Sequence, residues 1–185
     1  MPHRVCPWWM GYLLASPLRR LFDSPEKILN PFVHPGMTVV EPGPGMGFFT
    51  LPLARMVGPS GRVVVLEIQP KMLASLRRRA ARSGLLERLD LRLVQPDTMG
   101  LADLAEKVDF ALAFAVVHEM PSSKVFFLEA ARALKQKGTL FLAEPSGHVT
   151  AADFDGELKD AAQAGLSVTG RPVVRRNLTA LLAKV

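Results

Sequence analysis

A loop of glycines and one acid follows the first apolar run of the chain. It reads Glu41-Pro42-Gly43-Pro44-Gly45-Met46-Gly47, and its glycines let the backbone turn tightly and approach a ligand closely. The spacing is G-x-G-x-G, and Phe48 stands where the dinucleotide-binding fingerprint G-x-G-x-x-G has its third glycine. Because a carboxylate at Glu41 would repel a pyrophosphate, the loop favours a ligand that carries an amine or a positive charge.

Two further acids follow the next two apolar runs. Glu67 lies about 20 residues beyond the glycine loop, where a carboxylate commonly accepts hydrogen bonds from both hydroxyls of a ribose. Ile68 would then cover one face of a base. Asp97, in the segment Gln95-Pro96-Asp97-Thr98, fits two roles: it can accept from an adenine amino group or cap the next helix.

Histidines and glutamates follow the fourth and fifth apolar runs. They are His118, Glu119, Glu144 and His148. Such groups can take a proton from a nucleophile or form a polar floor that orients a substrate. The structural alternative is that His118 hydrogen-bonds locally and that Glu144 caps the turn before Pro145. We predict no metal site, because Pro145 and Gly147 oppose the helix that would bring Glu144 and His148 onto one face.

These residues must be positioned by alternating strands and helices. Short apolar runs bounded by Gly, Pro or charge predict strands over residues 37–41, 62–67, 89–95, 109–115 and 139–144. Helices are predicted over residues 47–57, 70–83, 101–106, 122–137 and 151–164. Two β-like runs, 166–174 and 178–185, have no helix between them and predict a hairpin. The pattern predicts an α/β fold: a doubly wound, mostly parallel, seven-stranded sheet (Rossmann-like) with helices on both faces and a C-terminal antiparallel hairpin. Ligands of such sheets bind beyond the carboxyl ends of the strands.

The motifs, taken in order, resemble one enzyme family. They are VVEPGPGMG (39–47), VVVLEI (63–68), VQPDT (94–98), VDFALAFAVVHEMP (108–121) and KQKGTLFLAEP (135–145). Their order and spacing resemble the class I S-adenosylmethionine-dependent methyltransferases of the small-molecule branch (methyltransferase type 11/25-like), from about residue 36 to the C-terminus. The resemblance implies S-adenosylmethionine as the methyl donor, S-adenosylhomocysteine as its product and a small-molecule acceptor.

The resemblance also implies a role for each matching residue. Glu41 is expected near the amino group of the donor, and Glu67 on its ribose hydroxyls with Ile68 against adenine. The glycine loop, through Gly43, Pro44, Gly45 and Gly47, is expected along the methionine part and ribose. Asp97 and the Thr98 backbone are expected at the adenine edge, and Phe114 along the methionine part. Apart from the resemblance, the positions after the fourth and fifth apolar runs assign catalysis to His118 and Glu144, and substrate binding to Glu119 and His148.

Composition and charge limit the remaining classes. The 185-residue chain has 23 basic and 17 acidic residues, and its only cysteine is Cys6, which excludes an internal disulfide, a cysteine zinc cluster, cysteine-based methyl transfer and the several-cysteine chemistry of arsenite methylation. The run Arg77-Arg78-Arg79 with Arg82 is read as the solvated face of a helix. Residues 93–158 carry ten acids and five bases, so nucleic acid is a disfavoured partner. An RNA or protein methyltransferase and a non-catalytic cofactor- or nucleotide-binding module stay as alternatives.

The N-terminal segment is distinct from the rest. Residues 1–35 are rich in proline and include Trp8 and Trp9; we interpret them as a lead-in that either covers the active site as a lid or covers the sheet edge. Residues 36–185 are predicted to form the methyltransferase domain. The first residues do not match a signal peptide, and no run reaches the roughly 18 apolar residues that span a bilayer. A cytoplasmic protein with no membrane partner is expected.

Overall fold

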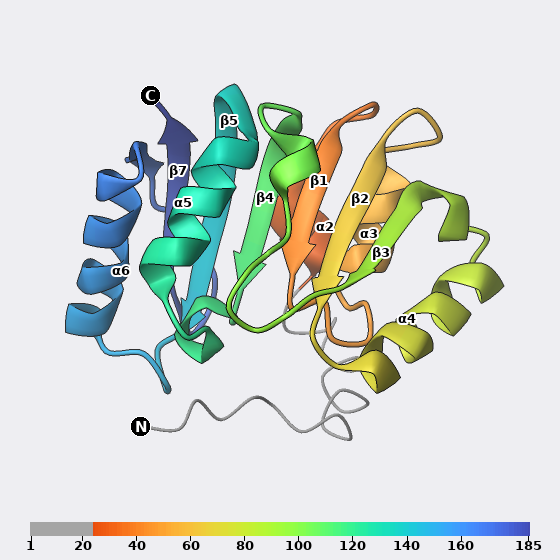
Figure 1. Ribbon diagram of the computed structural model, residues 1–185, viewed down its shortest axis with the longest axis horizontal. Helices are drawn as coiled ribbons and strands as arrows, with labels where there is room; N and C mark the ends of the chain where they lie inside the picture. The colour runs from red at the N-terminus through yellow and green to blue at the C-terminus, as the bar shows by residue number, and fades with distance from the viewer. Residues whose placement is uncertain (1–23) are drawn as a thin grey trace. The chain divides into compact units, whose positions relative to one another are not determined.

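The computed structural model describes residues 24–185 (Figure 1). These residues fall into two compact units, 24–94 and 95–185. The N-terminal residues 1–23, which include the predicted lid residues Trp8 and Trp9, lie outside the described part. No helix of the described part is long and apolar enough to cross a membrane.

The first unit alternates helices with three parallel strands. Its elements are α2 (Pro25–Leu29), β1 (Thr38–Pro42), α3 (Thr50–Met56), β2 (Arg62–Glu67), α4 (Pro70–Arg82), the short 3-10 turn η2 (Leu86–Arg88) and β3 (Leu89–Leu93). The strand order is β3-β2-β1, and Glu41 pairs with Val65. Ser24 caps α2 by accepting from the Lys27 amide, with Pro25 at the first helical position, which are residue types that favour a helix start.

The second unit holds the other four strands. Its elements are η3 (Ala102–Leu104), β4 (Val108–Phe114), η4 (Val117–Glu119), α5 (Ser123–Ala133), β5 (Leu134–Pro145), α6 (Ala151–Gln163), β6 (Leu166–Gly170) and β7 (Asn177–Lys184). The strand order is β4-β5-β7-β6; β4 and β5 are parallel, and β7 is antiparallel to both of its neighbours. The helices α5 and α6 pack side by side (Figure 1). Phe110, Phe127 and Phe141 are fully buried in this core.

The predicted fold class is confirmed. The first unit has three parallel strands, and the second has four, of which β7 is antiparallel to its neighbours. Together they make the seven-stranded, mostly parallel sheet that was predicted. The strands β6 and β7 form the predicted antiparallel hairpin. The strand over 62–67 and the helix from residue 70 begin where the sequence predicted. Pro52 is accommodated because it lies in the first turn of α3, where a backbone N–H would have no intrahelical partner.

Some predicted boundaries are wrong. The helix expected over 122–137 ends at Ala133, because the buried Leu134 takes an extended conformation and pairs with Val108 on β4. The helix expected over 101–106 is only the single turn η3. The strand expected over 89–95 ends at Leu93, before Pro96, which lacks the N–H needed to extend the ladder.

Candidate functional site

The glycine loop after β1 is held on one side and open at another. Gly43, Gly45 and Gly47 have φ of 64°, 55° and 90°, a region that residues with a Cβ rarely adopt. A Cβ added at Gly45 would meet nothing within 4 Å, whereas one at Gly47 would lie 2.5 Å from Cδ1 of Leu76 on α4. Gly47 therefore allows α4 to pack closely, and Gly45 faces open space.

Helix α4 also supports this loop through Arg79. Its guanidinium donates a hydrogen bond to the backbone carbonyl of Met46. The predicted solvated face of α4 is confirmed for Arg77, Arg78 and Arg82, which are exposed, but it is wrong for Arg79, which is half-buried. The sequence predicted the exposed arginine face of the helix, but it did not show that one of the arginines lies beside the glycine loop.

Glu41 is a buried carboxyl group at the carboxyl end of β1. It is 4% exposed, and its Oε2 has no hydrogen-bond partner. Burial raises the pKa of Glu41 to about 8; the nearby Thr50 hydroxyl opposes this rise, and the negative charge of Glu67 adds to it. The ammonium group of a ligand beside Glu41 would stabilise the ionised carboxylate and so lower its pKa.

Glu67 ends β2 as a second buried carboxylate. Its Oε1 accepts hydrogen bonds from the backbone amides of Ile68 and Gln69, both at 2.9 Å, at the start of α4. These bonds fix the orientation of the carboxylate. Ile68, which follows it, is half-buried.

The loop after β3 is held by a residue that the sequence reasoning missed. Glu129 on α5 accepts from the Thr98 hydroxyl at 2.8 Å and from the Met99 amide at 2.7 Å. Asp97 is exposed, and it does not cap the next helical turn, whose N-cap is Leu101. The capping alternative for Asp97 is therefore wrong. Phe114, at the end of β4, is half-buried.

Glu144, which is buried, and His118, which is half-buried, form a pair in the second unit. Glu144 is fully buried; its Oε1 accepts from the backbone amides of Val117 (2.8 Å) and Val116 (3.3 Å), and its Oε2 pairs with Nδ1 of His118. The hydrogen bond to Glu144 raises the pKa of His118; burial opposes this rise, and nearby carboxylates add to it. Glu144 thus holds the turn after β4 and orients the imidazole, instead of capping the turn before Pro145.

The turn that carries His118 has an unusual backbone. Ala115 has a φ of 55°, which is costly for a residue with a Cβ, and such conformations occur where surrounding contacts impose them. Here the Ala115 amide donates to the carbonyl of Ala143 on β5 at 2.7 Å, and Glu144 binds the next two amides. The ring of the exposed His148 lies edge-on to that of His118, with centroids 5.8 Å apart.

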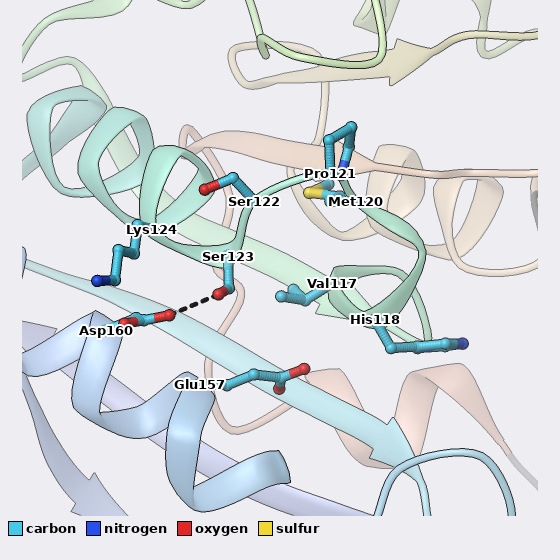
Figure 2. Close-up of a pocket in the computed structure, with 9 residues that line it drawn as sticks. All are labelled: Val117, His118, Met120, Pro121, Ser122, Ser123, Lys124, Glu157 and Asp160. Carbon is cyan, nitrogen blue, oxygen red and sulfur yellow. Dashed lines mark hydrogen bonds between the residues drawn. The ribbon is translucent and has the colours of Figure 1, made fainter. Parts of the chain in front are cut away.

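A pocket of about 370 Å³ opens beside this pair (Figure 2). Its lining residues are Val117, His118, Met120, Pro121, Ser122, Ser123, Lys124, Glu157 and Asp160. Glu119 is half-buried, and its charge acts on His118. Among residues 24–185, no group of three or more His, Cys, Asp or Glu side chains is arranged to hold a metal ion.

Glu157 is a buried acid in the pocket wall that was not selected from the sequence. It lies on α6, is 8% exposed, and its Oε2 has no hydrogen-bond partner. Burial raises its pKa to about 8, and the charge of Glu144 adds to this rise. The available signal was the buried stripe Phe154, Glu157 and Ala161 on one face of α6, where an acid is out of place.

Comparisons with known proteins agree on the family. A model described as a methyltransferase domain matches residues 33–173. An arsenite methyltransferase of Halobacterium salinarum is 29% identical over 110 residues, or 60% of this chain and 27% of that protein. A protein-L-isoaspartate O-methyltransferase of Triticum aestivum is 29% identical over 83 residues, or 45% of this chain and 36% of that protein. The chain thus spans about a third or less of the length of these curated relatives.

A solved structure extends the similarity over nearly the whole chain. The crystal structure of a SAM-dependent methyltransferase from Aquifex aeolicus has a TM-score of 0.84 and 25% identity, covering 98% of this chain and 100% of that one. The chain therefore belongs to the methyltransferase domain family, in the S-adenosylmethionine-dependent class that the sequence predicted. S-adenosylmethionine is the cofactor that this family membership implies.

The residues present fit this cofactor. S-adenosylmethionine carries an amino group and a ribose diol. The first unit offers the buried Oε2 of Glu41, which lacks a partner, the oriented carboxylate of Glu67, and open space at Gly45. An amine and two hydroxyls are the hydrogen-bond donors that such carboxyl groups accept from.

Proposed function

We propose that this protein transfers a methyl group from S-adenosylmethionine to a small-molecule acceptor, with His118 as general base and Glu144 as its positioning residue. The observation that carries this proposal is the His118–Glu144 pair at the wall of a pocket. The volume of about 370 Å³ lies within the range of roughly 300–1,000 Å³ that is usual for small-molecule sites.

The chemistry assigned to the chain is orientation and proton removal. S-adenosylmethionine supplies an activated methyl group for an in-line displacement, which demands alignment and exclusion of water. Because Nδ1 of His118 pairs with Glu144, its Nε2 is the atom left to accept a proton from the acceptor. The neutral imidazole is the active form, so the rate is expected to rise with pH through a His118 pKa above its ordinary value.

Cofactor binding is assigned mainly to the first unit. Glu41 is proposed to bind the amino group and Glu67 the ribose hydroxyls, with the backbone of the glycine loop beside them. The roles of Ile68, Asp97, Thr98 and Phe114 stay predictions from the family resemblance. The substrate contacts of Glu119 and His148 stay predictions from their positions after the fourth and fifth strands.

The acceptor is proposed to be small and not polyanionic. Glu144, Glu157 and Asp160 lie at or beside the pocket and oppose a nucleic acid there. Arsenite is not proposed, because the sequence has a single cysteine. A cytoplasmic location stays a prediction from composition.

An experiment on His118 tests the proposal. Binding of S-adenosylmethionine and S-adenosylhomocysteine is measured by calorimetry, and methyl transfer is measured on a panel of small nitrogen, oxygen and sulfur acceptors. His118→Ala is expected to lower turnover by roughly 10²–10⁴-fold and to leave cofactor affinity unchanged. The exposed His34 supplies the matched control, His34→Ala. Tight binding of NAD(H) without binding of S-adenosylmethionine would refute the proposal.

An RNA acceptor is the second candidate, favoured by the exposed arginines of α4. Its test is the reversal of Arg77, Arg78 and Arg82 to Glu, which leaves the loop contact of Arg79 in place. We expect weak RNA association that fades as salt rises, that the reversal abolishes, and that is not needed for methyl transfer. Loss of methylation in a folded, cofactor-binding triple variant would make the basic helix the substrate platform.

A further inference from the structure

Glu157 forms an acidic wall of the pocket that the proposed catalytic pair does not use. Glu157 is 8% exposed, and its Oε2 has no hydrogen-bond partner. In Figure 2 its carboxyl group points toward the turn that carries Val117 and His118. A buried polar atom without a hydrogen-bond partner destabilises the folded protein. A ligand that donates a hydrogen bond to Oε2 removes this cost, and so it binds more favourably than it would to a carboxylate exposed to water.

Carboxylates outnumber cations around Glu157. On its own helix, Asp153 and Asp160 face it; from β5, Glu144 faces it. Asp160 accepts a hydrogen bond from the Ser123 hydroxyl at 2.6 Å (Figure 2), so that acid already has a partner in the pocket wall.

The cations are fewer. His118, on η4, lowers the pKa of Glu157 through its positive charge. From α5, Lys124 lines the pocket. Because carboxylates outnumber cations around Glu157, the electrostatics of the pocket favour a ligand that carries a positive charge.

We propose that the pocket binds a small primary or secondary amine as the methyl acceptor, with Glu157 as the group that binds its nitrogen. This inference rests on the proposed function and names the acceptor class of the same site. An ammonium group presents several N–H donors and a charge, which match a buried carboxyl oxygen without a partner. A carboxylate or phosphate ligand would instead bring negative charge beside Glu144 and Asp160, and it would offer the Glu157 carboxyl group no N–H donor.

Methyl transfer to such an acceptor requires that its ammonium group first lose a proton. The ammonium loses one proton to Nε2 of His118, which exposes the nitrogen lone pair. The nitrogen then forms a bond to the methyl carbon while the carbon–sulfur bond of the donor breaks, and the electron pair stays on sulfur. The products are an N-methylated ammonium and a neutral thioether, and His118 returns its proton to solvent.

Proton release during binding tests the role of Glu157 without turnover. Near pH 6.5 Glu157 is protonated, because its pKa is about 8. Binding of an amine as a cation is therefore expected to release about one proton, measured by calorimetry in two buffers of different ionisation enthalpy. The probes are primary and secondary amines of small size, each paired with the alcohol of the same carbon skeleton.

Glu157→Gln gives the matched perturbation, since it keeps the shape of the side chain and removes the group that can ionise when an amine binds. It is expected to abolish the proton release and to weaken amine binding roughly 10- to 100-fold, with little effect on the paired alcohols. Asp155→Asn, an exposed acid on the same helix, is the control and is expected to behave as the wild type. Thermal unfolding of both variants establishes that they are folded.

The outcomes separate this inference from the proposed function. Preferential binding and methylation of amines, lost in Glu157→Gln, support it. Equal binding of amines and alcohols, or amine binding that survives in Glu157→Gln, overturns it and leaves Glu157 a structural residue. Methylation of alcohols, thiols or carboxylates that depends on His118 overturns the amine class alone. Failure to bind S-adenosylmethionine overturns the proposed function itself.

Discussion

Replacement of Glu144 by Gln changes one oxygen of a fully buried side chain into an amino group. The remaining oxygen can still accept from the amides of Val116 and Val117, so the turn keeps its support. The new amino group is a donor, and it faces Nδ1 of His118, which in the wild type pairs with a carboxylate. The imidazole must then carry its proton on Nε2, the atom that is proposed to accept the proton of the substrate.

The size of the effect follows from the role of a general base. Such a group contributes roughly 10²–10⁴-fold to a rate, which corresponds to about 3–5 kcal/mol of the barrier. Glu144→Gln is therefore expected to lower turnover by a factor in this range. Because the hydrogen bond that His118 donates to Glu144 is the main cause of the raised pKa of His118, the remaining activity is expected to rise at a lower pH than in the wild type.

Single-turnover methyl transfer, measured across pH, is the assay. Nitrogen chemical shifts of His118 report which ring nitrogen carries the proton, independently of turnover. Calorimetry is expected to give an unchanged affinity for S-adenosylmethionine, and Glu87→Gln, on an exposed residue, serves as the control. A Glu144→Gln variant that is folded and keeps the wild-type rate and pH profile would refute the reasoning about this pair.

Three further predictions concern the cofactor residues and stability. Glu67→Ala is expected to weaken S-adenosylmethionine binding by ~1–3 kcal/mol in calorimetry, because two ribose hydroxyls lose a charged partner; an unchanged affinity would place the ribose elsewhere. Arg79→Ala is expected to weaken cofactor binding by removing the support of the glycine loop, whereas Arg78→Ala, on the exposed face, is expected to have no effect, and equal behaviour of the two would contradict this. Glu41 and Glu157, both with a pKa raised to about 8, bind protons more tightly in the folded state. The contribution of these two groups to the free energy of unfolding is therefore fully present below their ordinary pKa of 4.5, and it is expected to be lost as pH rises toward 8. Urea unfolding measures this, and a flat profile between pH 5 and 8.5 would contradict it.

Local patterns determined much of the architecture. The buried run over 62–67 and the helix from Pro70 follow from apolar periodicity, and Ser24 with Pro25 gives a helix start that needs no distant partner. The glycine loop and Glu67 indicate the family through their spacing along the chain alone. These features depend on residues that are close in sequence, and so the sequence predicts them.

Distant contacts decided the chemistry of the second unit. His118 and Glu144 were each selected from the sequence, but their pairing depends on the register of β4 against β5, which places Phe114 beside Ala143. The same register explains why residues 134–137 are strand and not helix, since Leu134 pairs with Val108.

The burial of single polar groups was likewise set by packing. In the sequence, Glu157 looks like any acid on an amphipathic helix, and only the packing of α6 shows that it is buried. Arg79 likewise looks like the exposed arginines beside it, and only the fold shows that it contacts the glycine loop. Sequence determined which chemical groups the protein has and roughly where each follows a strand. Only the tertiary structure decided which of those groups share a pocket, because burial and partners depend on residues far apart in the chain.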